Sequence, residues 1–179
     1  MKVNKGRLRL PGAMLAALLL VLAVSACGSS TGGNAGDTQA AGQNGGPDQI
    51  DACSIVTQQD ATQLFGKPAS PQQAQLNVDP NMLGECLWTW DTQTSNQLLQ
   101  FRIWNGPQYY GNPPADSQPL DIGDKGYTRK NEFSGVTIEW VQNGKTITLD
   151  YSTIGSDVPN AATKSDAVKN LAQKASQQM

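Results

Sequence analysis

The sequence predicts an α+β domain, an antiparallel sheet with a short N-terminal helix and a C-terminal helix packed on one face. Three observations support this prediction. Several stretches alternate apolar and polar residues with a period of two, as half-buried strands do. A short amphipathic stretch precedes them, and a stretch rich in helix formers follows them. Residues 49–179 are also long enough for a single domain with one core.

A short helix is expected just after Cys53, in the stretch SIVTQQDATQLFG. Thr57 and Asp60 have the spacing of a capping box at a helix start. Gly66 follows as a helix terminator ahead of a proline. The apolar positions fall on one face of this helix: Ala61, Leu64 and Phe65.

The first expected strand lies in CLWTWDT, where alternation places Cys86, Trp88 and Trp90 on one side. The run LLQFRIWNG also alternates and is expected to be its hairpin partner, joined through residues 92–97. Cys86 must face the helix if it is to reach Cys53. We therefore interpret Trp88 and Trp90 as core residues, with a binding platform as the alternative.

The clearest hairpin is GVTIEWVQNGKTITLDY, in which Asn143-Gly144 favours a two-residue type I′ turn. Counting outward from that turn brings apolar residues together on one face. The intervening pairs are mostly polar, which predicts a sheet with one polar face toward solvent. The apolar pairs are Trp140 with Ile147, Ile138 with Leu149, and Val136 with Tyr151.

The C-terminal stretch DVPNAATKSDAVKNLAQKASQQM is rich in helix formers. Its apolar residues recur at helical spacing and form a narrow stripe, and lysines occupy the remaining surface. We expect a helix that lies against the sheet and frays near its end. The stripe consists of Ala161, Val168, Leu171, Ala172 and Ala175.

The first residues predict export. Four basic residues precede an uncharged run over residues 11–24, which is shorter than the roughly 20 apolar residues of a membrane-spanning helix. The sequence VSAC at the end of this run, residues 24–27, has the apolar-small-small-cysteine order of a bacterial lipobox. We therefore expect a lipoprotein signal peptide over residues 1–26 and acylation of Cys27 with diacylglycerol and palmitate. The alternatives are an ordinary signal peptide and an uncleaved transmembrane anchor.

Residues 27–48 predict a lipidated tether, since after Cys27 they are small or polar and include many glycines. Roughly 20 such residues span about 25 Å. After the predicted cleavage the chain has nine basic and fifteen acidic residues, a formal charge of −6, and no dense basic cluster. This balance excludes nucleic acid as an expected partner. The lipid is then what holds the protein to the cell membrane, on its extracytoplasmic side.

Cys53 and Cys86 are the two cysteines that remain once Cys27 is lipidated. Exported proteins meet an oxidising environment, so a Cys53–Cys86 disulfide is expected. The alternative is a redox or metal role. It is disfavoured because the two thiols form no CxxC motif and the chain contains no histidine.

Catalytic motifs are not evident in the sequence. The absence of histidine excludes Ser-His, Cys-His and His-ligated metal arrangements. Asp121 and Asp124 could offer oxygens to calcium, but their spacing does not match an EF-hand. Glu85 has no second carboxylate positioned to make a glycosidase-like pair. We expect a protein that is not an enzyme, with no catalytic residue, metal site or cofactor.

The aromatic segment WNGPQYYGNPP is the candidate for partner contact, through Trp104, Tyr109 and Tyr110. Exposed rings in a loop rich in glycine and proline suit recognition, and local packing is the alternative. We expect a non-catalytic interaction or accessory module whose partner is a protein or a cell-envelope ligand. The alternative function is a carrier or sensor that binds an apolar or glycan ligand on the Trp-rich face. The oligomeric state is left open.

The order of these motifs resembles a family of actinobacterial lipoproteins known only as a domain of unknown function. The shared features are a cysteine ahead of a short helix ending in Phe-Gly, a second cysteine two positions before Trp88, and a Gly-Asp-x-x-Tyr step that ends at Tyr127. Ala52 and Gly126 stand where the family often has proline and alanine. The resemblance implies a lipid-anchored extracytoplasmic domain with one disulfide, and it implies no activity.

Overall fold

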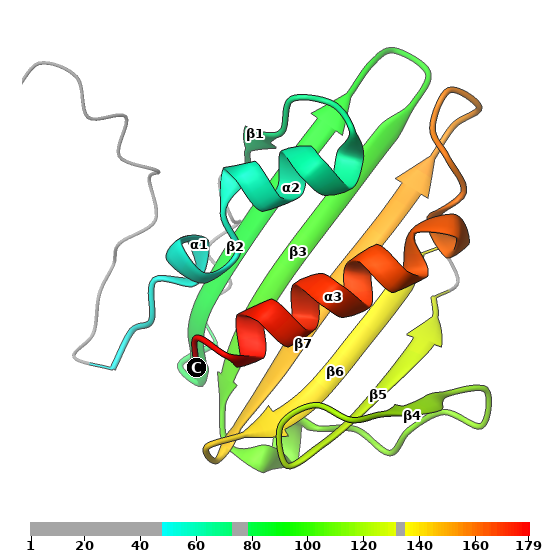
Figure 1. Ribbon diagram of the computed structural model, residues 1–179. Helices are drawn as coiled ribbons and strands as arrows, with labels where there is room; N and C mark the ends of the chain where they lie inside the picture. Colours follow the sequence, from blue (N-terminus) through cyan, green and yellow to red (C-terminus); the bar gives the residue numbers. More distant parts are fainter. Residues whose placement is uncertain (1–47, 73–78, 132–134) are drawn as a thin grey trace, which may run out of the picture. The chain divides into compact units, whose positions relative to one another are not determined.

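The structure is a computed structural model that describes residues 48–72, 79–131 and 135–179 (Figure 1). These residues all belong to one unit of the chain, Thr38–Met179. Cys27, the predicted signal peptide and residues 27–47 of the predicted tether lie outside the described residues. Within the described ranges, no helix is both long enough and apolar enough to cross a membrane.

The fold is α+β, as predicted, and is built on a seven-stranded antiparallel sheet with the order β1-β2-β3-β7-β6-β5-β4. Hairpins join β2 to β3 and β6 to β7, and β3 pairs with β7 in the middle of the sheet. The chain must therefore cross from β3 to β4 at the far edge. The strands are β1 (Ser70–Pro71), β2 (Met82–Asp91), β3 (Asn96–Asn105), β4 (Gln118–Leu120), β5 (Lys125–Lys130), β6 (Val136–Gln142) and β7 (Lys145–Ile154).

The predicted N-terminal helix is α2, and its start and end are those expected. The Thr57 side chain accepts a hydrogen bond from the Asp60 backbone, and the Asp60 carboxylate accepts one from the Thr57 backbone. Gly66 ends the helix in the left-handed conformation, with φ of 69°. The helical elements are α1 (Ala52–Ile55), α2 (Gln58–Phe65), η1 (Pro107–Tyr109), η2 (Ala161–Lys164) and α3 (Ser165–Ser176).

The Asn143-Gly144 hairpin is confirmed in turn and in register. Both turn residues have positive φ, 51° and 71°, as a type I′ turn requires. The three predicted apolar pairs are those of the β6–β7 ladder: Val136 with Tyr151, Ile138 with Leu149, and Trp140 with Ile147.

The first hairpin is confirmed, but β2 begins four residues before the predicted Cys86 and the turn is shorter than predicted. Trp88 is a core residue, as interpreted: it is 5% exposed and its Nε1 donates to the Val56 carbonyl at 2.9 Å. Trp90 is only partly buried, and the Lys67 ammonium lies 5.9 Å from its ring centroid. The Trp-rich side of β2 is thus closed off by the N-terminal segment.

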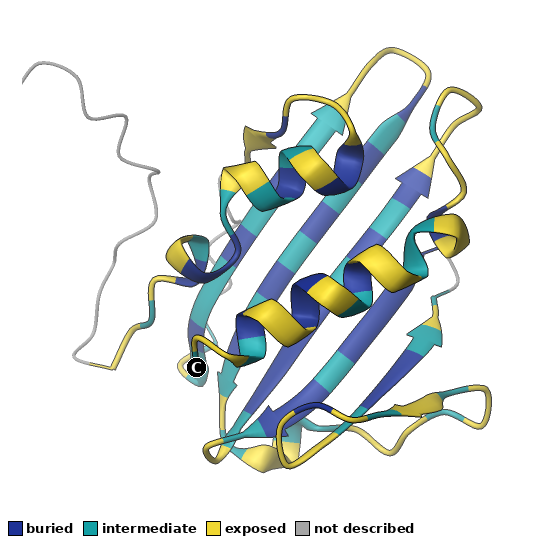
Figure 2. Ribbon diagram, in the orientation of Figure 1, coloured by how far each residue is buried: buried dark blue, intermediate teal, exposed yellow. Residues whose placement is uncertain are grey.

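The core lies between the helices and one face of the sheet. Figure 1 shows α2 and α3 lying across the same face, and Figure 2 shows buried positions alternating along the strands beneath them. The disulfide Cys53–Cys86 is present, with 5.1 Å between Cα atoms, and ties α1 to β2. Every residue of the predicted C-terminal stripe is buried: Ala161, Val168, Leu171, Ala172 and Ala175.

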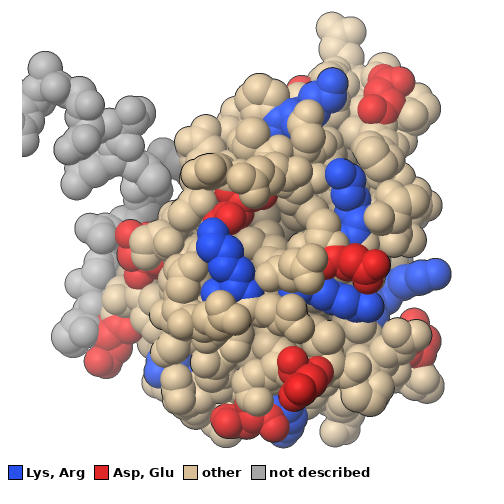
Figure 3. Space-filling view, viewed as in Figure 1, with Lys and Arg blue, Asp and Glu red and all other residues tan. Residues whose placement is uncertain are grey.

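The helix-covered side of the molecule carries interspersed lysines and acidic residues (Figure 3). Lys174 of α3 reaches across to α2, where its ammonium lies 2.6 Å from the Asp60 carboxylate. Burial alone would raise the pKa of Asp60, but hydrogen bonds from Lys174 and Thr57 outweigh it and hold that pKa below its usual value. This pair links the two helices above the core.

Candidate functional site

The face of the sheet opposite the helices, which we call the open face, carries polar and charged side chains on the neighbouring strands β3, β7, β6 and β5. Arg102 of β3 pairs with Thr148 of β7, Thr137 of β6 pairs with Asp150 of β7, and Arg129 of β5 pairs with Thr137. Side chains of paired residues point to the same face of a sheet. The prediction of a polar second face is therefore confirmed, and these four strands bring two arginines and two carboxylates together on it.

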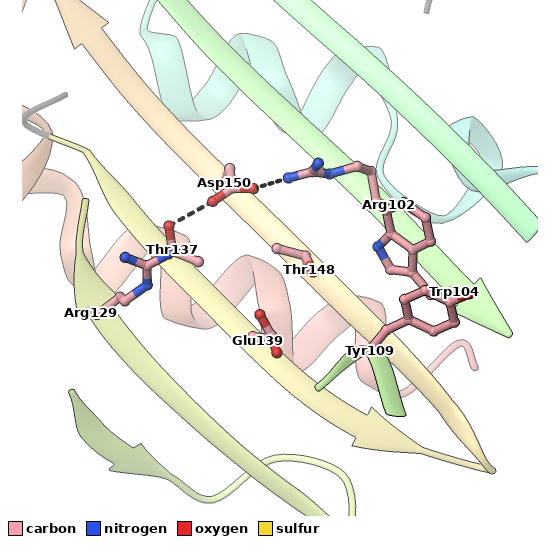
Figure 4. A pocket seen from close by; sticks show the side chains of 8 residues that line it. All are labelled: Arg102, Trp104, Tyr109, Arg129, Thr137, Glu139, Thr148 and Asp150. Atoms are coloured by element: carbon pink, nitrogen blue, oxygen red, sulfur yellow. Dashed lines mark hydrogen bonds and ion pairs between the residues drawn. The ribbon is translucent and has the colours of Figure 1, made fainter. Parts of the chain in front are cut away.

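The open face is hollowed into a cleft of about 300 Å³ (Figure 4). This volume is at the lower end of the range for pockets that bind small organic molecules. Short threonines form its floor between longer side chains, and Thr137 and Thr148 are 3% and 8% exposed. The cleft is lined by Arg102, Trp104, Tyr109, Arg129, Thr137, Glu139, Thr148 and Asp150.

Asp150 lies at the centre of a hydrogen-bond network in the cleft. One carboxylate oxygen accepts from Arg102 Nη2 at 2.6 Å, and the other accepts from Thr137 Oγ1 at 2.6 Å. Both partners of the ion pair are about three-quarters shielded from solvent. The charges of Arg102 and Asp150 therefore offset each other, and the network fixes both side chains in place.

Glu139 holds the wall of the cleft by two hydrogen bonds. Its carboxylate accepts from the Tyr127 hydroxyl at 3.1 Å and from the Gly111 backbone N–H at 2.9 Å. Burial and the negative charge of Glu139 raise the pKa of Tyr127 to about 12. Tyr127 therefore stays protonated near neutral pH and remains a hydrogen-bond donor.

The connection from β3 to β4 places the predicted contact residues beside the cleft. The Tyr109 ring stacks on Trp104, with 5.2 Å between centroids, and both line the cleft. The Tyr110 ring meets Tyr127 edge-on at 5.4 Å, and the Lys125 ammonium lies 4.4 Å from the Tyr110 centroid. The local packing considered for this segment is thus present. Contact of Trp104, Tyr109 and Tyr110 with a partner stays a prediction.

The guanidinium of Arg129 differs from the other charged groups of the cleft. Within the described residues it makes no hydrogen bond and no ion pair, and its Nε is buried without a partner. The Nε of Arg102 is likewise buried and unpartnered. A buried donor without a partner costs about 1–3 kcal/mol. The cleft therefore has donor capacity that the described protein groups leave unused.

The other residues considered as candidate metal, catalytic or redox sites do not line the cleft. Asp121 and Asp124 are exposed, and the described residues contain no group of three or more His, Cys, Asp or Glu side chains placed to hold a metal. Glu85 lies on the open face, where its carboxylate accepts from Gln100 Nε2 at 2.6 Å. Cys53 and Cys86 form the expected disulfide, so neither sulfur is a free thiolate that could bind a metal.

No family model, no curated protein and no solved structure matches the chain. The resemblance to the lipoprotein family stays a prediction.

Proposed function

We propose that the protein is a lipoprotein, anchored through acylated Cys27 on the extracytoplasmic side of the cell membrane, whose folded domain is a non-catalytic binding module. The observation that carries the proposal is the cleft on the open face. Its lining comes from four strands and from η1, so a rigid scaffold holds its polar groups in place. Preorganised polar groups in a concave site are typical of ligand recognition.

The hydrogen bonding of the cleft favours binding over catalysis. The two carboxylates each accept two hydrogen bonds from protein donors: Asp150 from Arg102 and Thr137, and Glu139 from Tyr127 and Gly111. Carboxylates engaged in this way serve to orient side chains and backbone. The chain also contains no histidine to act as a base near neutral pH.

A carrier or sensor for a glycan ligand is the second candidate function, and the stacked rings of Trp104 and Tyr109 favour it. These rings belong to the open face. On the other side of the sheet, Trp88 packs among buried residues. We therefore place ligand binding on the open face and expect a polar ligand.

The anchor is tested by Cys27→Ser, which removes the thiol that is acylated. We expect the wild-type protein to sediment with membranes and to carry diacylglycerol on its first mature residue, and we expect the variant to lose both properties. Intact-protein mass spectrometry and membrane fractionation measure them. Ser25→Ala is the matched control, since it keeps a small residue in the lipobox and should leave the anchor intact. An unmodified sulfur on Cys27 of the wild-type protein would contradict the proposal.

The binding surface is tested by photo-crosslinking of the anchored protein in its own membrane. A photoreactive amino acid replaces Tyr109 beside the cleft or, as control, Gln173, an exposed residue of α3. We expect covalent adducts from position 109 and none of comparable yield from position 173. Adducts formed only from position 173 would assign the contact to the helix-covered side and overturn the choice of face.

A further inference from the structure

We propose that the cleft binds a small, hydroxylated organic molecule with a single negative charge, of the sugar-acid class, and that Arg129 holds its carboxylate. This inference rests on the proposed function, because it names the ligand class of the same surface.

Arg129 is the charged group of the cleft that an anionic ligand would pair with. Of the four charged groups that line the cleft, Arg102 and Asp150 pair with each other, and Glu139 accepts from two protein donors. The Arg129 guanidinium has no such partner among the described residues, although its Nε is buried. A guanidinium presents its N–H groups as a planar fork that matches the two oxygens of a carboxylate. A carboxylate would satisfy this donor and offset its charge.

Glu139 limits the charge of the ligand. It lines the same cleft, two positions along β6 from Thr137, the strand partner of Arg129. Its carboxylate has no cationic partner in the described part of the chain. A second negative charge on the ligand would be repelled at this short range. The cleft therefore suits a monoanion better than a phosphate dianion.

The other lining groups suit hydroxyls and a ring. The Thr148 side chain lies on the floor, and Glu139 has acceptor capacity left for a ligand hydroxyl. Figure 4 shows Trp104 and Tyr109, whose rings stack on each other, as an aromatic wall at the opposite end of the cleft from Arg129. A pyranose ring presents C–H groups to such a wall and hydroxyls at its edge. The small volume of the cleft suits one sugar unit.

A glycerol-phosphate lipid headgroup also carries hydroxyls and a single negative charge. The charge of the protein argues against that source, because a chain of formal charge −6 after the predicted cleavage is repelled by an anionic bilayer. We therefore assign the ligand to free or glycan-borne sugar acids.

The test is titration of the full chain in detergent with sodium glucuronate, and with glucose as the uncharged analogue. We expect glucuronate to bind and to shift the side-chain N–H signal of Arg129 in NMR spectra, and we expect glucose to bind at least about tenfold more weakly. Arg129→Gln should lower glucuronate affinity by about tenfold or more, and Arg129→Lys should lower it less. Lys130→Gln is the matched control, since it removes the adjacent charge from the other face of β5 and should change affinity less than about twofold.

Three results would each overturn the inference. The first is that the wild-type protein does not bind glucuronate at millimolar concentration. The others are that Arg129→Gln binds glucuronate as tightly as the wild-type protein does, or that the wild-type protein binds glucose as tightly as glucuronate. Unchanged circular dichroism and Arg129→Lys separate lost binding from lost folding. A shift of the Arg129 side-chain N–H signal on adding phosphatidylglycerol micelles, without such a shift on adding glucuronate, would assign the site to lipid and also overturn it. If glucuronate fails while crosslinks from position 109 persist, the ligand class is wrong and the proposed function stands.

Discussion

Tyr127 shows how burial and one contact on the open face together shift a pKa. Its ring meets Tyr110 of the β3–β4 connection edge-on, and its hydroxyl donates to Glu139. Its pKa is raised to about 12 by burial first and by that carboxylate second. Because the folded pKa lies above the unfolded value, this residue stabilises the fold fully below pH 10 and loses its contribution as pH rises through about 12.

Glu139→Gln is expected to lower the pKa of Tyr127 toward its ordinary value, because the variant removes a negative charge and leaves burial in place. The measurement is a site-resolved NMR titration of the tyrosine ring carbons. Tyr151 is the internal control: burial alone raises its pKa to about 12, and its hydroxyl donates to Gln97 at 2.7 Å. A Tyr127 pKa that stays in place in the variant would show that burial alone sets it.

At the level of single residues, the sequence predicted the aromatic residues of the cleft and the polar face of the β6–β7 hairpin, but it did not place Arg129. Trp104 and Tyr109 can be predicted as contact residues from composition, because aromatic residues in a loop of glycine and proline are unusual. Arg102 lies on the polar side of a predicted strand. Arg129 could not be placed, since its position opposite Thr137 depends on the pairing of β5 with β6, a contact between strands that the local pattern does not specify.

Among the elements, those with a strong local signal were predicted and those formed by tertiary pairing were not. The capping box of α2 and the Asn-Gly turn of the β6–β7 hairpin are encoded within a few residues. β1 and β4 contain two and three residues, and each has a proline, so alternation cannot identify them. They become strands because the longer strands β2 and β5 offer open edges to pair with.

The same reasoning explains why the cleft was not predicted as a cleft. The alternation of apolar and polar residues along the strands predicts a polar face, but it does not show that the β3–β4 connection folds against that face. Glu139 fixes the connection at Gly111, and Thr146 fixes it through the Gly106 carbonyl at 2.8 Å. These contacts join residues 28 and 40 positions apart. The cleft is therefore a product of chain crossing, and its walls come from distant segments.

Across the whole molecule, the disulfide joins the short N-terminal helix α1 to the sheet. α1 has four residues, too few to form a stable helix alone, and Cys53 ties it to Cys86 beside the buried Trp88. The bridge closes a loop with a sequence separation of 33. In the chain-entropy model, closing such a loop stabilises the fold by about 3–4 kcal/mol.

The double variant Cys53→Ala/Cys86→Ala is expected to lower the free energy of unfolding of the full chain by about 3–4 kcal/mol, because its unfolded state regains the entropy that the bridge removes. Urea unfolding followed by tryptophan fluorescence measures this difference. The wild-type protein with its disulfide reduced is the matched control and should unfold at nearly the same midpoint as the variant. A variant that unfolds within about 1 kcal/mol of the oxidised wild type would show that packing of α1 and α2 over the sheet holds this segment without the bridge.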